Sequence, residues 1–358
     1  MEMLRPVHED HGASFVTVGE REVVADYGRP ERTHRAVRNA AGVTEHPVGV
    51  VTVTGDDRHE FVDNAVSNAI SVEDGHGVYA LLLDPQGGIR TDLYVFTTAE
   101  RLLVLTPPGE AGPLADDWAG KTFIQDVNVT TATDEFVVFG VYGPKATEKI
   151  ASVTPAQTPD EPLSFIRGSM GDAGVTVVRD DGLTGEEGYL VVSGVEAATD
   201  VFDTLENRGM NAVPFGRTVW ETLTLEAGTP LFETELAGRI PNQLGLRNAI
   251  DFDKGCFVGQ EVVSRIENRG QPSKRLVGLA PAAQPAADAA VFDGDEAVGE
   301  ITRATDSPTL ECPIALALID ADASDELAVR VDGSNVSATR RDLPFVEGSD
   351  TSARLPTY

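Results

Sequence analysis

The sequence predicts an α+β protein whose helices and strands form segregated units, followed by a small all-β unit. Two observations carry this prediction. Up to about residue 226, helix and strand patterns alternate without the regular strand–helix–strand period of a doubly wound parallel sheet. From residue 275 to 345, the pattern consists of short strands and turns, which is typical of a small β-barrel. With 358 residues, of which 41% are apolar, the chain is long enough for two or three packed domains.

The first part of the chain predicts two helices and a strand meander. A helix is expected over residues 31–41, with Gly42 as its C-cap. The β-branched alternation of residues 48–53 predicts a strand, and the aspartates after Gly55 open a second helix. Three further strands are expected over residues 79–83, 93–97 and 101–105, with a turn at 85–88.

A second unit is expected to begin near residue 127 and a third near residue 269. The second unit should contain strands over residues 136–142, 175–179 and 189–192, and helices over 145–153, 196–208, 217–226 and 260–268. The predicted domain boundaries are therefore 1–126, 127–268 and 269–358.

Charge is the first unusual property of the chain. The formal net charge is −30, and lysine occurs at only five positions. The acidic residues are scattered along the chain, which favours hydration and solubility at the cost of self-repulsion that salt must screen. We interpret this as a halophilic adaptation to a salty cytoplasm. The same charge argues against binding nucleic acid, whose phosphates require a basic surface.

Composition also limits the cellular compartments in which the protein is expected. No apolar run approaches the length of a membrane span, and the charged N-terminus lacks the apolar core of a signal peptide. Two cysteines suit a reducing compartment, so we expect a cytoplasmic protein without membrane association. The six histidines show no metal-ligand spacing with cysteine, and no metal site is expected.

The most informative segment is residues 254–261, which read KGCFVGQE. It places Cys256 between Lys254 and the start of a predicted helix. A nearby ammonium group and the positive end of a helix dipole both favour the nucleophilic thiolate. The alternative is a small buried hydrophobe in a turn, which is the usual role of a lone cysteine. Cys312 precedes a proline in a strand pattern and is expected in the core.

This octapeptide resembles the signature of the YgfZ family of folate-binding proteins, which are linked to the maintenance of iron–sulfur enzymes. That family is similar to the T-protein, the aminomethyltransferase of the glycine cleavage system. Residues 182–189 (GLTGEEGY) and 225–232 (LEAGTPLF) resemble T-protein motifs, and residues 299–317 resemble its C-terminal barrel signature. The resemblance implies a three-domain aminomethyltransferase-like fold around a central folate pocket.

The resemblance also implies a set of site residues. Glu186, in the turn that resembles T-G-E-x-G-Y, corresponds to a carboxylate that accepts two hydrogen bonds from the pterin edge. Without the family, that turn is simply a glycine-rich acidic loop. Tyr189, Tyr79, Lys254 and Gln260 are the other residues expected to bind the cofactor, which would be tetrahydrofolate or a one-carbon derivative.

Two departures from the T-protein concern catalysis. The T-protein motif G-G-x-x-D-D-L reads GGIRTDL at residues 87–93, so one aspartate of the pair is Thr91 and the other is Asp92. Adjacent strand residues point to opposite faces, so Asp92 cannot replace a carboxylate at position 91. In the helix that resembles R-D-x-L-R-L-E-A-G, Trp220 and Thr224 replace both arginines.

These observations lead to two main functional hypotheses, and a third, a non-catalytic folate-binding regulator, stays open. The first is a YgfZ-type protein that binds tetrahydrofolate and supports assembly or repair of iron–sulfur enzymes, with Cys256 and Asp92 as the reactive residues. Its partners would be iron–sulfur proteins or their assembly machinery. The alternative is a folate-dependent aminomethyltransferase or a related one-carbon transferase, which has no need for Cys256.

Overall fold

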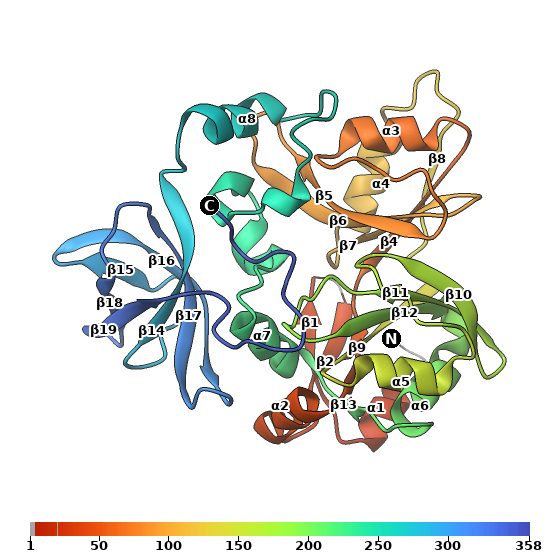
Figure 1. The fold of residues 1–358 in the computed structure, drawn as a ribbon, viewed down its shortest axis with the longest axis horizontal. Helices are drawn as coiled ribbons and strands as arrows, with labels where there is room; N and C mark the ends of the chain where they lie inside the picture. The colour runs from red at the N-terminus through yellow and green to blue at the C-terminus, as the bar shows by residue number, and fades with distance from the viewer. Residues whose placement is uncertain (1–3, 20) are drawn as a thin grey trace.

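Four β-sheets organise the part of the chain that the computed structural model describes, residues 4–19 and 21–358 (Figure 1). They are a two-stranded ribbon, a five-stranded sheet, a six-stranded sheet and a closed barrel of six strands. The expected α+β class and the C-terminal barrel are both confirmed. Residues 1–3 and 20, which belong to the first predicted unit, lie outside the described residues.

The five-stranded sheet has the order β5-β6-β7-β4-β8 and is antiparallel. Alternate residues of its strands face α3 and α4 and form an apolar core with Trp118 and Phe61. Its elements are β4 (Gly49–Thr54), α3 (Arg58–Ala65), β5 (His76–Leu83), β6 (Ile89–Thr97), β7 (Leu102–Thr106), α4 (Ala111–Ala119) and β8 (Asn128–Thr131).

The six-stranded sheet has the order β10-β11-β12-β9-β3-β13, and α5 and α6 cover its outer face. Only the short β13 pairs in parallel, with β3. Its elements are β3 (Gly42–His46), β9 (Phe136–Tyr142), α5 (Ala146–Val153), β10 (Phe165–Met170), β11 (Ala173–Arg179), β12 (Gly188–Gly194), α6 (Ala198–Asn207) and β13 (Val213–Pro214).

The inner faces of these two sheets meet across a shared apolar core. Phe96 and Leu105 contribute from the five-stranded sheet, and Val138 and Leu190 contribute from the six-stranded sheet. Helix α7 (Arg217–Glu226) packs into the same core, next to the ribbon β1 (Ser14–Val18) and β2 (Arg21–Asp26). The short α1 (Arg5–Asp10) and the longer α2 (Pro30–Asn39) flank this arrangement.

The barrel closes in the order β14-β17-β16-β15-β18-β19 around an apolar interior. Its strands are β14 (Lys274–Pro281), β15 (Ala290–Asp293), β16 (Glu296–Ser307), β17 (Cys312–Asp320), β18 (Glu326–Val331) and β19 (Ser334–Arg341). Short helical turns η2 (Phe232–Leu236), η3 (Pro241–Leu244) and η4 (Arg247–Ala249), then α8 (Gln260–Arg269), connect it to α7.

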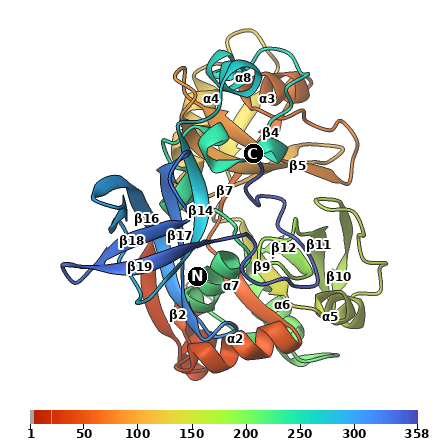
Figure 2. The same cartoon turned by 60° about the vertical axis from the view of Figure 1, so that its left-hand side comes forward.

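The last residues of the chain leave the barrel and return to the two sheets (Figure 2). We call residues 342–358 the C-terminal segment. Its backbone amides at Val346, Asp350 and Ala353 donate hydrogen bonds to the carbonyls of Glu226, Gly185 and Asp181. The segment is therefore part of the folded body.

The structure differs from the sequence predictions in two ways that have physical reasons. Gly42 is the first residue of β3 instead of a helix C-cap, because α2 ends at Asn39 and Gly42 already pairs with Tyr142 of β9. The sheets also do not follow the boundary near residue 126, since β3 joins the six-stranded sheet and β8 joins the five-stranded sheet. Among the described residues, no helix is long and apolar enough to cross a membrane.

Candidate active site

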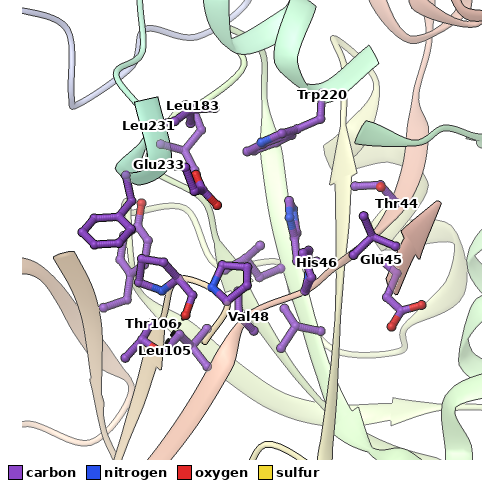
Figure 3. Close-up of a pocket in the computed structure, with 18 of the residues that line it drawn as sticks. Thr44, Glu45, His46, Val48, Leu105, Thr106, Leu183, Trp220, Leu231 and Glu233 are labelled. Atoms are coloured by element: carbon purple, nitrogen blue, oxygen red, sulfur yellow. Dashed lines mark hydrogen bonds between the residues drawn. The ribbon is translucent and has the colours of Figure 1, made fainter. Parts of the chain in front are cut away.

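A cavity opens between the two sheets and α7, with an empty volume of about 980 Å³ including its mouth. Residues from β2, β3, β6, β7, β9, β12, α7 and η2 line it, so both sheets build it together. Its walls are largely apolar, with Leu183, Leu190 and Val138 among them. Trp220 extends from α7 above His46, and Glu233 lies across the cavity from them (Figure 3). A concave, mostly apolar cavity with a few polar groups is typical of a small-molecule site.

Strand β6 presents Asp92 to this cavity. Thr91 pairs with Leu82, which belongs to the core beneath α3 and α4, so Thr91 faces away from the cavity. Asp92 and Tyr94 lie on the other face of the strand, and both line the cavity. The alternation that we expected thus makes Asp92, and not position 91, the carboxylate that faces the cavity.

The two oxygens of Asp92 differ in their surroundings. Oδ2 accepts hydrogen bonds from the hydroxyl of Tyr79 at 3.1 Å and from Nη1 of Arg354 at 2.8 Å. Oδ1 is buried and has no hydrogen-bond partner among the described residues. Burial raises the pKa of Asp92, while Arg354 and the Tyr79 hydrogen bond act to lower it. The unpartnered oxygen is a preformed acceptor for a ligand proton.

Arg354, in the C-terminal segment, joins Asp92 to a second acidic group. Its Nη2 donates to the hydroxyl of Tyr94 at 2.7 Å, and its guanidinium stacks on the ring of Tyr79 at 4.1 Å. The Tyr94 hydroxyl in turn donates to Asp181, at 2.9 Å and 3.1 Å from the two carboxylate oxygens. Burial and repulsion from Asp181 raise the pKa of the adjacent Asp180 to about 7.

His46 lines the cavity below Trp220, across from Glu233 (Figure 3), and it is neutral near pH 7. Burial, together with repulsion from Arg217, lowers its pKa to about 4. Its Nε2 is 2.8 Å from the Tyr142 hydroxyl, and its ring meets that of Trp220 edge to face at 4.7 Å. His46 and Trp220 therefore form an uncharged aromatic wall opposite the carboxylates.

Of the seven predicted site residues, Asp92 lines the cavity, and Tyr79 contacts Asp92 through the hydrogen bond to Oδ2. Glu186 is buried nearby, but both of its oxygens are already engaged. Oε1 accepts from Arg38 at 3.0 Å, and Oε2 accepts from the amide and hydroxyl of Ser349 at 2.9 Å and 2.6 Å. The expectation of a free carboxylate for the pterin edge is therefore corrected, because the C-terminal segment occupies its hydrogen bonds.

Tyr189 lies on the opposite face of β12 from the cavity, and its neighbour Leu190 lines the cavity instead. The Tyr189 ring belongs to the core beneath α5 and α6, and its hydroxyl lies 2.9 Å from that of Thr147. The alternation of strand residues turns Tyr189 away from the cavity, so this placement does not support its predicted role in cofactor binding.

The residues of the octapeptide also lie away from the cavity. Cys256 is exposed in a loop, four residues before α8 begins at Gln260. A dipole effect falls off within the first helical turn, so Cys256 is poorly placed to benefit from it. Neither Gln260 nor Lys254 lines the cavity. The predicted roles of Lys254 and Gln260 in cofactor binding, and of Cys256 as an activated nucleophile, are not supported by this placement.

Lys254 instead closes the C-terminal end of α3. Its Nζ lies 2.6 Å from the carbonyl oxygen of Asp63, 3.1 Å from that of Val66 and 2.9 Å from that of Asn68. The side chain is 5% exposed and also contacts Oδ1 of Asp63 at 3.2 Å. An ammonium group at a helix C-terminus satisfies carbonyls that have no partner within the helix.

We expect the Lys254→Met variant to lose about 3 kcal/mol of unfolding free energy, because it leaves several buried carbonyls unpaired. Denaturant unfolding at constant salt measures this loss. Lys121→Met is the matched control, since Lys121 is 53% exposed and pairs only with Asp117, so it should cost less than about 1 kcal/mol. Equal effects of the two substitutions would contradict the structural role of Lys254.

Comparison with known proteins adds an independent observation. The family profile described as GCVT N-terminal domain matches residues 4–254, and the glycine cleavage T-protein C-terminal barrel domain matches residues 274–347. The chain belongs to the glycine cleavage T-protein family. An aminomethyltransferase of Cutibacterium acnes is 33% identical over 97% of this chain and 98% of that protein, and one of Streptomyces coelicolor is 31% identical over 96% of each.

A solved T-protein has the same fold. The crystal structure of glycine cleavage system aminomethyltransferase T from Bartonella henselae superposes with a TM-score of 0.87, covering 98% of both chains at 22% identity. The resemblance to the T-protein is confirmed. Its narrower form, membership of the YgfZ family, is not supported by these relatives, which are named aminomethyltransferases.

Sequence reasoning missed several residues of this T-protein-family site. Arg354 carries no local signal, because nothing in the sequence shows that the segment after the barrel returns to β6. Asp181 could have been found from the sequence, because an aspartate stands there in place of the first threonine of the T-G-Y-T-G-E motif. Outside the cavity, Glu226 also had a signal, because a single carboxylate within the apolar end of α7 requires buried partners.

Proposed function

We propose that the protein is a folate-dependent aminomethyltransferase that forms methylene-tetrahydrofolate from an aminomethyl group presented on a lipoyl carrier. The observation that carries the proposal is Asp92, a buried cavity carboxylate with an unpartnered oxygen, in a chain of the T-protein family. The curated relatives that match over nearly their full length are named for this activity.

The cavity suits a reduced folate by its chemistry. Leucine and valine side chains form apolar walls that can pack against a bicyclic ring, with a few polar groups among them. Trp220 and the neutral His46 provide aromatic edges. Bound tetrahydrofolate would supply the secondary amines that accept the one-carbon unit, and Asp92 would hold or accept a proton beside them at Oδ1.

Arg217 compensates for one of the arginines that the sequence lacks. It precedes Trp220 by three residues on α7, so it lies on the same helix face, and it lines the same cavity. Its guanidinium contacts Glu221 at 2.6 Å and Glu233 at 3.7 Å. A carboxylate of a folate tail would replace one of these two glutamates as the partner of Arg217. The second missing arginine corresponds to Thr224, whose hydroxyl accepts a hydrogen bond from Arg303 of the barrel at 2.9 Å.

The iron–sulfur hypothesis depended on an activated Cys256. In the structure, Lys254 donates to carbonyl oxygens at the C-terminal end of α3. Cys256 is exposed and lies four residues before the first residue of α8. Both reasons for expecting a reactive thiolate are thereby removed. The placement of Cys256 favours the transferase, which needs no thiol in the cavity.

The Cys256→Ala variant separates the two functions. We expect it to bind tetrahydrofolate with unchanged affinity by calorimetry in molar potassium chloride. It should also form methylene-tetrahydrofolate from an aminomethylated lipoyl carrier at the wild-type rate. Cys312→Ala serves as the matched control, because Cys312 is also exposed. Transfer that disappears with Cys256 alone, or a wild-type protein that binds no reduced folate, would contradict the proposal.

A further inference from the structure

The C-terminal segment is built into the wall of the active site. A Cβ on Gly182 would collide with the carbonyl oxygen of Thr351, and a Cβ on Gly348 would collide with that of Gly185. Arg179 pairs with Asp350 at 2.6 Å, and the side-chain amide of Asn248 donates to the Ala353 carbonyl at 2.8 Å. These close contacts fix the backbone that leads to Arg354.

Fixing the segment places the Arg354 guanidinium between two carboxylates. It is 6% exposed and bonds to Asp92 directly and to Asp181 through the Tyr94 hydroxyl. Because its Nη1 occupies Oδ2 of Asp92, only Oδ1 remains for a ligand. The two hydrogen bonds that Oδ2 accepts, from Arg354 and from Tyr79, also restrict how the carboxylate rotates.

We propose that Arg354 is a positioning residue, which orients Asp92 for substrate and couples it through Tyr94 to Asp181. The inference rests on the proposed transferase activity and deepens it. Arg354 acts through Asp92, and Asp181 tunes the same carboxylate from the far end of the chain of hydrogen bonds. The site then depends on a residue of the C-terminal segment, which lies outside both sheets.

The charges around Asp92 determine whether a substitution nearby makes this carboxyl group easier or harder to ionise. Arg354 stabilises its ionised form, whereas the negative charges of neighbouring acids destabilise it. The ionisable groups that face Asp92 or interact with it come from five elements: Tyr79 of β5, Tyr94 of β6, Asp181 of the turn before β12, Glu233 of η2 and Glu110 before α4. Removing Arg354 should therefore make Asp92 harder to ionise, and removing Asp181 should make it easier.

The decisive experiment compares the pH–rate profiles of two variants. Arg354→Gln should lower kcat and move the acidic limb to higher pH by about one unit or more, because the favourable charge is lost. Asp181→Thr, which restores the motif residue, should move the limb to lower pH. Arg354→Lys keeps the charge without the two-pronged contact, so it should restore the position of the limb but only part of kcat.

Two further measurements make the result unambiguous. Asp350→Asn loosens the same segment at its contact with Arg179 and should leave the limb in place. Infrared difference spectra, with Asp92→Asn used to assign the band of the protonated carboxyl, follow Asp92 without turnover. A wild-type protein without transfer would refute the function, while the infrared titration would still test the coupling. Three results would overturn the inference. They are shifts of the acidic limb in the same direction for Arg354→Gln and Asp181→Thr, no shift in either variant, or an equal shift in Asp350→Asn.

Discussion

The Asp92→Asn variant is expected to lose about 10²–10⁴-fold in kcat while retaining tetrahydrofolate binding within a few-fold. Asparagine has nearly the same shape, so the contacts with Tyr79 and Arg354 retain an acceptor, but the amide cannot take up a proton. The loss should therefore appear in kcat and not in KM. Steady-state transfer from an aminomethylated carrier, with calorimetry for binding, measures the two quantities separately.

Thr91→Val is the control for this prediction. Thr91 is adjacent in sequence but faces the core beneath α3 and α4, where its hydroxyl, among the described residues, donates only to the carbonyl of Asp92. We expect a modest loss of stability and turnover within about two-fold of wild type. If Asp92→Asn retained wild-type turnover, or if Thr91→Val lost as much as Asp92→Asn, the assignment of the catalytic carboxylate would be wrong.

The second large effect concerns stability and depends on Glu226, which is fully buried where α2, α7 and the barrel meet. Its Oε2 contacts Nε2 of His34 at 2.9 Å and Nη2 of Arg38 at 2.7 Å, and its Oε1 accepts from Ser307 at 2.5 Å. Burial alone would raise its pKa, but the His34 hydrogen bond, Arg38 and the Ser307 hydroxyl together lower it to about 2. Glu226→Gln should lower the unfolding free energy near pH 7 by about 3 kcal/mol, because it leaves Arg38 inadequately compensated.

The pH dependence of stability gives an independent check on Glu226. A carboxylate whose pKa is lower in the folded state contributes stability above its unfolded pKa, near 4.5, and loses it as the pH falls toward 2. Wild type should lose about 3 kcal/mol from this group over that interval, and Glu226→Gln should lose correspondingly less. Asp74→Asn, at an exposed pair with Arg167, should change stability by less than about 1 kcal/mol. Parallel stability–pH curves for wild type and Glu226→Gln would refute this account.

Local patterns were sufficient to predict most of the α-helices and the strands β4 to β7, β9, β11 and β12. The range of α7 was predicted correctly, and that of β9 as well, because strand and helix periodicity are properties of a few consecutive residues. The octapeptide illustrates the limit of such reasoning. Its lysine suggested an activated thiol, but the fold directs Lys254 to carbonyls almost 190 positions earlier in the chain.

The active site itself depends on contacts between distant segments, which a single sequence does not reveal. Asp92 was predicted, but the Arg354 that holds it lies 262 residues further along the chain. Glu186 was predicted to bind ligand, and only the fold shows that Ser349 occupies its carboxylate. The interpretation of the net charge of −30 as a halophilic adaptation stays a prediction, so assays should be run across a range of salt concentrations.

The most direct test of the proposed activity is a single-turnover reaction followed by carbon-13 NMR. The protein is mixed in excess with tetrahydrofolate and a lipoyl carrier whose aminomethyl carbon is labelled. The account predicts that the carrier signal disappears, a methylene-tetrahydrofolate signal replaces it, and one equivalent of ammonia is released, with Asp92→Asn slowing all three together. A label that stays on the carrier in the presence of folded, folate-bound wild-type protein would contradict it.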